Sequence, residues 1–346
     1  MNPMIYTILI TSLSTSTIII MTSHHWLLAW LALELNTMSI IPLIIKPHHP
    51  RATEAATKYF LIQAMAAALI LFASTMNAWQ TGQWSITHTM SPTASIIMTT
   101  AIMMKLGVVP AHFWYPEVLQ GSTMRTALIM STWQKIAPLT LLYLTLNNLP
   151  TNIMITMGLA SALIGGWMGL NQTQTRKILA FSSIAHMGWL LIALTMNPAL
   201  TTLTMTTYLM MTTSTFLLLD MTETKTLLDM GTVWSLSPTM LTSMMMTLMS
   251  LGGLPPLTGF MPKWAILKDL TLMNLTPLSL TLALASLPSL FFYIRMAYLT
   301  MLTTPPHTTN TQHKWRSKPN LHTLTTPTII LTTLLLPTTH LLYNTT

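Results

Sequence analysis

Four ionisable residues lie far from the ends of long apolar segments, where a membrane-spanning helix would bury them: Glu34, Lys105, Lys135 and Lys263. Lys135 lies ten residues into RTALIMSTWQKIAPLTLLYLTL, roughly 15 Å from either surface of a bilayer at a helical rise of 1.5 Å per residue. Snorkelling of a lysine stem from a helix end does not reach that far. Because a charge at the bilayer centre costs at least about 2.5–3.5 kcal/mol, several such residues indicate a polar pathway.

Lysine and glutamate in such positions can exchange protons. A buried lysine loses its proton more readily than a lysine in water, and a nearby carboxylate restores it. Glu34 is the only carboxylate that the sequence places at mid-depth. We therefore predict that Glu34 sets the charge of Lys105, and that Lys135 takes up the proton that Lys105 releases.

Two of the lysines stand beside runs of glycine and proline. Pro110 follows Lys105 in MKLGVVPAHFWYPEV, and Gly253 and Pro256 precede Lys263 in SLGGLPPLTGFMPKW. Proline removes a backbone donor and clashes with the preceding helical turn, so both helices are expected to break. A mere kink is the alternative for a single proline. Two dense runs, each beside a lysine, favour broken helices, which a membrane tolerates only where they line a cavity or are buried in protein.

The elements that must position these residues are membrane helices. Charged residues make up only 6% of the 346 residues and hydrophobic residues 51%, which excludes a soluble globular domain. A bilayer core requires about 20 apolar residues per helix. This length predicts eleven spans, near 3–22, 25–45, 54–77, 94–121, 125–146, 150–170, 176–196, 199–219, 238–272, 276–302 and 324–343.

Basic residues fall almost entirely on one side of these spans. The loops on the side of the N-terminus hold Lys46, Arg51, Arg125, Arg176, Lys177, Lys225, Lys314, Arg316 and Lys318. The opposite side holds only Lys268. The positive-inside rule then places the N-terminus in the positive-inside compartment and the C-terminus on the opposite side.

The two expected breaks fall in the fourth and ninth spans, which run in opposite directions. This offset is typical of an inverted repeat with its ion site at the repeat interface. We predict one transmembrane domain over 1–346, with a first repeat in about 25–146 or less and a second in about 150–302. A loop and the last helix fill 303–346. The same offset relates Glu34 to the region of His186, for which a hydrogen-bonded packing histidine remains the alternative.

Several function classes are excluded by what the sequence lacks. It contains no cysteine, so it holds no disulfide, no thiolate catalyst and no cysteine-ligated iron–sulfur cluster. No Gly-rich nucleotide-binding motif follows a strand pattern. No basic stripe interleaved with aromatic residues indicates nucleic-acid binding. No metal site is expected.

Four stretches of the chain resemble a known family: HHPRATEAATKYFL (48–61), KLGVVPAHFWYPEVLQG (105–121), GLNQTQTRKILAFSSIAHMGW (169–189) and GGLPPLTGFMPKWAI (252–266). The family is that of the antiporter-like subunits in the membrane arm of mitochondrial NADH:ubiquinone oxidoreductase, respiratory complex I. The resemblance covers essentially the whole chain. It implies an all-α polytopic membrane protein with two inverted five-helix repeats, each with a broken helix, and a central hydrophilic axis.

The resemblance also implies roles for individual residues. The family's helix-borne glutamate matches Glu34, and its central lysine matches Lys135. The lysines of the two broken helices match Lys105 and Lys263, and the polar position of the second repeat matches His186. A supporting role is expected for the neighbouring residues His112, Pro110, Pro256 and Gly253.

The function that the resemblance implies is proton translocation coupled to electron transfer from NADH to ubiquinone. Other subunits would handle NADH, flavin, the iron–sulfur clusters and ubiquinone, and this chain would need no cofactor. Other membrane-arm subunits, among them neighbouring antiporter-like subunits, and lipids such as cardiolipin are the expected partners. The implied location is the mitochondrial inner membrane, with the N-terminus on the matrix side and the C-terminus on the intermembrane-space side.

Three alternatives remain open. The buried charges and broken helices would also serve a free-standing cation/proton antiporter. A haem- or quinone-binding electron carrier could use His24, His25, His112 or His186 as ligands. A purely structural subunit is the third alternative, although buried lysines make it costly.

Overall fold

The computed structural model describes residues 3–235, 237–301 and 323–338, and within these ranges the secondary structure is helical, without a β-strand. The chain divides into two compact units, Met1–Gly158 and Leu159–Thr346. Unit 1 contains α1 (Pro3–Thr22), α2 (Trp26–Ile45), α3 (Pro50–Thr81), α4 (Pro92–Leu106), α5 (Trp114–Gly121), α6 (Met124–Ser131), α7 (Trp133–Leu144) and the 3-10 turn η1 (Leu146–Asn148). Helix α8 (Thr151–Gly169) begins in unit 1 and ends in unit 2.

Unit 2 continues with α9 (Thr175–Met196), α10 (Pro198–Thr222), α11 (Leu227–Thr232), η2 (Val233–Ser235), α12 (Pro238–Gly252), α13 (Phe260–Leu272), α14 (Thr276–Met301), α16 (Thr325–Leu334) and η3 (Leu336–Thr338). The basic cluster Lys314, Arg316 and Lys318 lies outside the described residues, as does the end of the last expected span.

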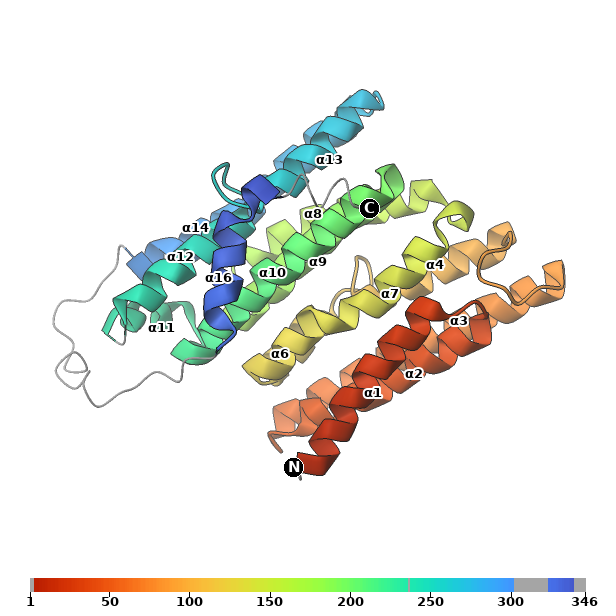
Figure 1. Cartoon of the computed structure of the whole chain (residues 1–346), viewed down its shortest axis with the longest axis horizontal. Helices are drawn as coiled ribbons and strands as arrows, with labels where there is room; N and C mark the ends of the chain where they lie inside the picture. The colour runs from red at the N-terminus through yellow and green to blue at the C-terminus, as the bar shows by residue number, and fades with distance from the viewer. Residues whose placement is uncertain (1–2, 236, 302–322, 339–346) are drawn as a thin grey trace. The chain divides into compact units, whose positions relative to one another are not determined.

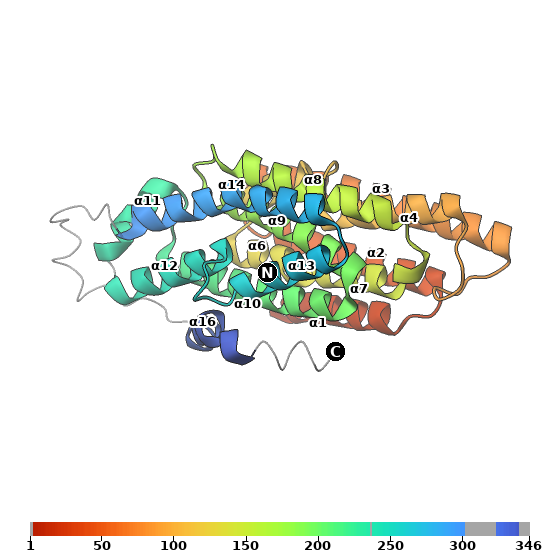
Figure 2. The same cartoon turned by 90° about the horizontal axis from the view of Figure 1, so that it is seen from above.

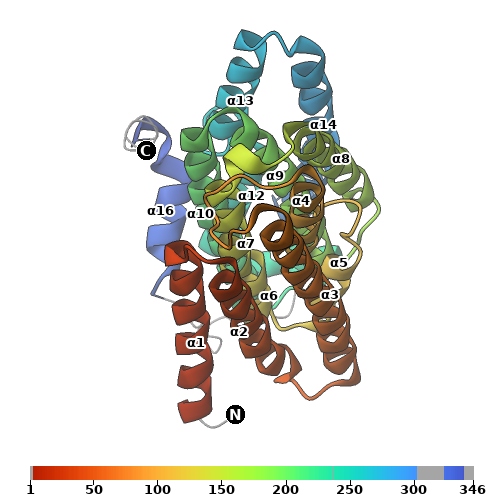
Figure 3. The same cartoon turned by 90° about the vertical axis from the view of Figure 1, so that its right-hand side faces the viewer.

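The packing within each unit follows the order of the helices. In unit 1, α1, α2 and α3 run side by side and α3 also packs against α4 and α5 (Figure 1). In unit 2, α9 forms the buried centre and contacts α10, α13 and α14. Helix α16 lies at the edge of unit 2 against α10 and α12 (Figure 2). Helices α13 and α14 form a hairpin joined by a short turn (Figure 3).

Threonine and serine fit inside these apolar helices because their hydroxyls bond to the preceding turn. Thr207, for example, is buried on α10 and donates to the carbonyl of Leu203 at 3.0 Å. Ser183 on α9 donates to the carbonyl of Ala180 at 2.8 Å. Such back-bonding satisfies the hydroxyl without water, and it explains how a chain rich in threonine forms buried helices.

Six of the described helices are long and apolar enough to cross a membrane: α1, α2, α3, α8, α9 and α14. The expected spans near 94–121, 125–146 and 238–272 are each divided into two shorter helices. The prediction of a helical, polytopic membrane protein is thus supported in its coarse form. The number of eleven spans and the inverted repeats remain predictions, as does the assignment of 1–346 to one domain.

Both expected breaks are present. Helix α4 ends at Leu106, and Gly107 caps it with a φ of 73°; α5 begins only at Trp114. Helix α12 ends at Gly252, Gly253 caps it with a φ of 82°, and α13 begins at Phe260. These left-handed backbone conformations favour glycine, because a Cβ there crowds the backbone. A further interruption at Thr132, between α6 and α7, was not expected from the sequence.

Candidate functional site

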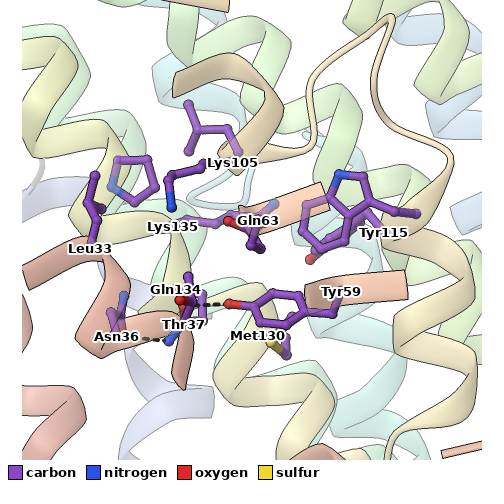
Figure 4. A pocket seen from close by; sticks show the side chains of 13 residues that line it. Leu33, Asn36, Thr37, Tyr59, Gln63, Lys105, Tyr115, Met130, Gln134 and Lys135 are labelled. Atoms are coloured by element: carbon purple, nitrogen blue, oxygen red, sulfur yellow. Dashed lines mark hydrogen bonds between the residues drawn. The ribbon is translucent and has the colours of Figure 1, made fainter. Parts of the chain in front are cut away.

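Lys105 and Lys135 line one cavity of about 20 Å³ within unit 1. Such a volume holds about one water molecule. Figure 4 shows both lysine side chains reaching into the same space, from α4 and α7. The other residues that line the cavity are Leu33, Asn36, Thr37, Tyr59, Gln63, Leu106, Trp114, Tyr115, Met130, Gln134 and Pro138.

Lys105 is buried without a hydrogen-bond partner. It lies in the last turn of α4, directly before the first break, and is only 6% exposed. Its Nζ has no partner among the described residues. The C-terminal end of a helix favours a cation. Because no hydrogen bond from the protein holds the Lys105 ammonium, its protonation depends on nearby charges and on water.

Glu34 is the charge that acts on Lys105. The two side chains are close enough for an electrostatic interaction, but they are not hydrogen-bonded to each other, since the Lys105 Nζ has no hydrogen-bond partner among the described residues. Glu34 itself does not line the cavity, although its neighbours Leu33, Asn36 and Thr37 on α2 do. Its Oε2 is buried and has no hydrogen-bond partner. A small movement of α2 would therefore change the field at Lys105.

Lys135 lies in the first turn of α7, just after the interruption at Thr132, and is 3% exposed. Its Nζ lies 4.8 Å from the centroid of the Tyr115 ring. This cation–π geometry stabilises the ammonium form in a place that water reaches poorly. Tyr115 belongs to α5, so the contact links the far side of the first break to α7.

A buried amide network in the same cavity was missed from the sequence. Gln134 Nε2 donates to Asn36 Oδ1 at 2.9 Å, and the Tyr59 hydroxyl donates to Gln134 Oε1 at 3.4 Å (Figure 4). Gln63 on α3 also lines the cavity. The sequence did show these amides within apolar spans. Because a buried polar group without a partner is costly, their presence could have indicated that they bond to one another.

A second cavity of about 20 Å³, within unit 2, is lined by His186 and Lys263. Lys263 donates a hydrogen bond of 2.9 Å to the carbonyl of Gly252. The Nε2 of His186 lies 3.5 Å from the hydroxyl of Tyr293, and its ring centroid lies 5.6 Å from that of Tyr208. Thr204 and Thr207 add hydroxyl groups to this cavity. Each unit thus pairs a lysine beside a broken helix with a second titratable residue.

The supporting residues lie in or beside the breaks. His112 is 2% exposed, its Nδ1 lies 3.2 Å from the Pro110 carbonyl, and its Nε2 has no partner among the described residues. His112 does not line the first cavity. Gly253 lies against Lys263, because a Cβ on Gly253 would stand 3.0 Å from Lys263 Nζ. Pro256 is exposed in the second break.

The predicted site residues thus form two groups. Lys105 and Lys135, with Glu34 nearby, belong to unit 1; His186 and Lys263 belong to unit 2. Their roles, and the common mid-membrane plane that the inverted repeat predicts for the three lysines and His186, remain predictions. Among the described residues no group of three or more His, Asp or Glu side chains is placed to hold a metal ion.

Comparison with known proteins adds an independent line of observation. Residues 23–289 match the family described as NADH:quinone oxidoreductase/Mrp antiporter, and residues 290–343 match the NADH dehydrogenase subunit 2 C-terminus. The chain is 52% identical over 335 residues to NADH-ubiquinone oxidoreductase chain 2 of Sibirionetta formosa. It is 51% identical over 334 residues to that of Gallus gallus. Both alignments cover 96% of each chain.

Two solved structures share the fold. A chain of respiratory complex I from Thermus thermophilus superposes with a TM-score of 0.84 at 23% identity, covering 99% of this chain and 78% of that chain. A chain of the Mrp complex from Dietzia sp. superposes with a TM-score of 0.83 at 14% identity, covering 97% of this chain and 75% of that chain. At these identities the likeness establishes the fold alone.

Proposed function

The chain belongs to the NADH:quinone oxidoreductase/Mrp antiporter family, in the branch of NADH-ubiquinone oxidoreductase chain 2, and from this premise we propose that it moves protons within the membrane arm of respiratory complex I. It is a subunit of an oxidoreductase, and its own part in the reaction is proton translocation. The observation that carries the proposal is the burial of Lys105 and Lys135 in one small cavity.

Proton movement in the first unit begins with the charge of Lys105. While Glu34 is close, its carboxylate favours the ammonium form of Lys105. Withdrawal or protonation of Glu34 releases the proton, and a water in the shared cavity carries it to Lys135. The face of the Tyr115 ring then stabilises the ammonium that forms on Lys135.

The second unit supports the same chemistry. His186 and Lys263 share a cavity with the hydroxyls of Thr204 and Thr207, which donate to carbonyls of α10 and keep oxygen lone pairs to accept a hydrogen bond from the cavity. We propose that protons pass between the lysine pair of unit 1 and this pair along a mid-membrane axis. The eleven spans and the two inverted repeats belong to the same proposal.

The redox cofactors belong to other subunits in this proposal. The chain has no cysteine, so it lacks the thiolates that ordinarily hold iron–sulfur clusters. NADH, flavin and ubiquinone are likewise assigned to other subunits. The further partners proposed are the neighbouring antiporter-like subunits, together with lipids such as cardiolipin.

We propose that the chain lies in the inner mitochondrial membrane with its N-terminus on the matrix side and its C-terminus on the intermembrane-space side. The support is the one-sided distribution of lysine and arginine. A free-standing cation/proton antiporter is the weaker alternative. The relatives that match 96% of the chain are named as chains of the oxidoreductase, whereas the likeness to the Mrp complex is one of fold.

The deciding experiment replaces the buried ammonium with a neutral side chain of similar length. We expect assembled complex carrying Lys135→Met to move fewer protons per NADH oxidised, in sealed inner-membrane vesicles. The matched control is Lys268→Met, because Lys268 is exposed and lines neither cavity. An assembled Lys135→Met complex with unchanged electron transfer and an unchanged proton-to-electron ratio would refute the proposed role.

A further inference from the structure

Tyr293 is a buried hydroxyl-bearing residue of α14 that the sequence did not single out. It is 1% exposed. Its hydroxyl lies 3.5 Å from Nε2 of His186. The side chain of Ser182 also lies near this hydroxyl, while its own hydroxyl donates to the carbonyl of Leu179 at 2.8 Å. A single phenol thus faces two residues of α9 that can each exchange a proton.

The two residues lie one turn apart on the same face of α9. Ser182 precedes His186 by four residues, which corresponds to about 6 Å along the helix axis. The N-terminal end of α9 carries Arg176 and Lys177, which the charge distribution assigns to the matrix side. A step from His186 to Ser182 is therefore a step toward the basic end of the helix.

We propose that Tyr293 relays protons between Ser182 and His186, so that it forms the matrix-side connection of the second cavity. This proposal rests on the proton-translocating function proposed above. In the uptake direction, the Ser182 oxygen accepts a proton while its own hydroxyl proton, turned away from the Leu179 carbonyl, passes to the oxygen of Tyr293. The phenolic proton of Tyr293 passes to Nε2 of His186. At each hydroxyl one O–H bond forms as another breaks, so Ser182 and Tyr293 stay neutral and His186 becomes an imidazolium.

The separation of 3.5 Å makes this contact a candidate control point. A strong hydrogen bond to a hydroxyl requires about 2.8 Å, so the phenol and the imidazole must approach before the proton can pass. The Tyr293 ring also packs against Gly252, because a Cβ on Gly252 would meet Tyr293 side-chain atoms at 3.8 Å. The Gly252 carbonyl also accepts the hydrogen bond from Lys263. A movement of the Lys263 ammonium can therefore shift Gly252 and, through it, the Tyr293 ring.

A purely structural role for the Tyr293 hydroxyl makes a different prediction. In that case the ring would fill the core and the hydroxyl would only satisfy a buried nitrogen. Loss of the hydroxyl would then lower the thermal stability of the complex and leave proton transfer intact. A relay, in contrast, loses proton transfer while the fold survives, because phenylalanine keeps the ring.

The test compares two tyrosines of the same helix. Tyr293→Phe removes the relay hydroxyl, and Tyr298→Phe is the matched control because Tyr298 is 53% exposed. We expect assembled Tyr293→Phe complex to show a lower proton-to-electron ratio in sealed vesicles than assembled Tyr298→Phe complex. An equal ratio in the two variants, with normal electron transfer, would overturn the relay.

A second pair of variants applies if Tyr293→Phe does not assemble. Ser182→Ala removes the next hydroxyl of the route, and Ser183→Ala removes the neighbouring one. Both hydroxyls donate to a carbonyl of α9 at 2.8 Å, so the two variants lose the same bond and differ in the proximity of Ser182 to Tyr293. We expect only Ser182→Ala to lower the ratio; equal ratios would again overturn the relay.

The outcome is compared with that of Lys135→Met. If Lys135→Met lowers the ratio and loss of the Tyr293 or Ser182 hydroxyl does not, the relay is wrong and the proposed function stands. If none of the three lowers it, both are wrong.

Discussion

The ammonium of Lys263 donates a hydrogen bond of 2.9 Å to the carbonyl of Gly252, the last residue of α12. Lys263 itself lies in the first turns of α13, so this bond joins the two halves of the broken helix. The carbonyls at a helix C-terminus carry partial negative charge and favour a cation. The lysine that is proposed to carry protons therefore also holds the break together, and loss of its charge would weaken that contact.

The first prediction concerns Gly253, which caps α12 with a φ of 82°. Gly253→Ala should destabilise the chain by about 1–2 kcal/mol, the cost of a left-handed conformation for a residue with a Cβ. The new Cβ would also stand 3.0 Å from Lys263 Nζ, which displaces the ammonium from the Gly252 carbonyl. The measurements are the thermal stability of the complex and its proton-to-electron ratio.

The neighbouring residue provides the control for this change. A Cβ on Gly252 would meet only the Tyr293 side chain, at 3.8 Å, so Gly252→Ala should be tolerated. Equal stability and equal proton-to-electron ratios in the two variants would show that the conformation of Gly253 is unimportant.

The sequence predicted the two breaks because glycine and proline act locally on the backbone. Gly107 and Gly253 cap their helices in the left-handed conformation that these residues allow. The interruption at Thr132 was missed, since threonine is not a helix breaker. Its hydroxyl donates to the carbonyl of Leu128 at 2.7 Å, a bond that depends on the local geometry of the helix.

The sequence alone identified those candidate proton carriers whose charge is unusual within an apolar span. Glu34, Lys105 and Lys135 are of this kind. Tyr293 and Gln134 were missed because a tyrosine or an amide in a membrane helix is unremarkable until its partner is known. The partners come from distant helices: Gln134 meets Asn36 across 98 residues of sequence, and Tyr293 meets His186 across 107.

The second prediction tests Glu34 as the switch for Lys105. Glu34→Gln keeps the shape of the side chain and removes its charge, so assembly should survive and coupled proton transfer should fall. Glu117→Gln is the control, because Glu117 is paired with Lys58 outside the cavity and Lys58 retains Glu54. The measurement is the proton-to-electron ratio of assembled complex in sealed vesicles. An unchanged ratio with normal electron flow would show that Glu34 is only a packing partner.

The third prediction concerns the amide network of the first cavity. Gln134→Leu leaves Asn36 Oδ1 without its donor, and Asn36 is only 3% exposed. We expect a loss of about 1–3 kcal/mol, the cost of a buried polar atom without a partner. Tyr59→Phe should cost less, because its bond to Gln134 is longer, at 3.4 Å. Thermal stability of the complex measures both, and a larger effect of Tyr59→Phe would contradict this ranking.

The fourth prediction concerns topology. Arg176, Lys177 and the basic residues of 314–318, which lie outside the described residues, should all face the matrix. A cysteine introduced at 316 should react with a membrane-impermeant thiol reagent only after the inner membrane is inverted, and the chain offers no native cysteine to interfere. A cysteine in place of Lys268 should show the opposite accessibility. Labelling of position 316 in intact mitoplasts would reverse the assigned orientation.

The fifth prediction concerns the hydrogen bond that ties the second break to the last helix. The Thr258 hydroxyl donates to the carbonyl of Thr332 at 2.6 Å. Thr258 is 2% exposed and Thr332 is fully buried. Thr332 lies in the last turn of α16, where carbonyls lack part of their helical donors. The bond therefore satisfies a buried acceptor while it fixes the segment 253–259 that precedes Lys263.

Thr258→Val keeps the shape of the side chain and leaves that carbonyl without this donor. We expect a loss of about 1–3 kcal/mol and faster amide hydrogen exchange in 253–262, because the break is released from α16. Thr258→Ser retains the hydroxyl and should restore slow exchange. Thr333→Val is the control, since the Thr333 hydroxyl bonds only to carbonyls of its own helix. If Thr258→Val and Thr333→Val exchange alike in 253–262, α16 does not hold the break, and the position of Lys263 depends on its bond to Gly252 alone.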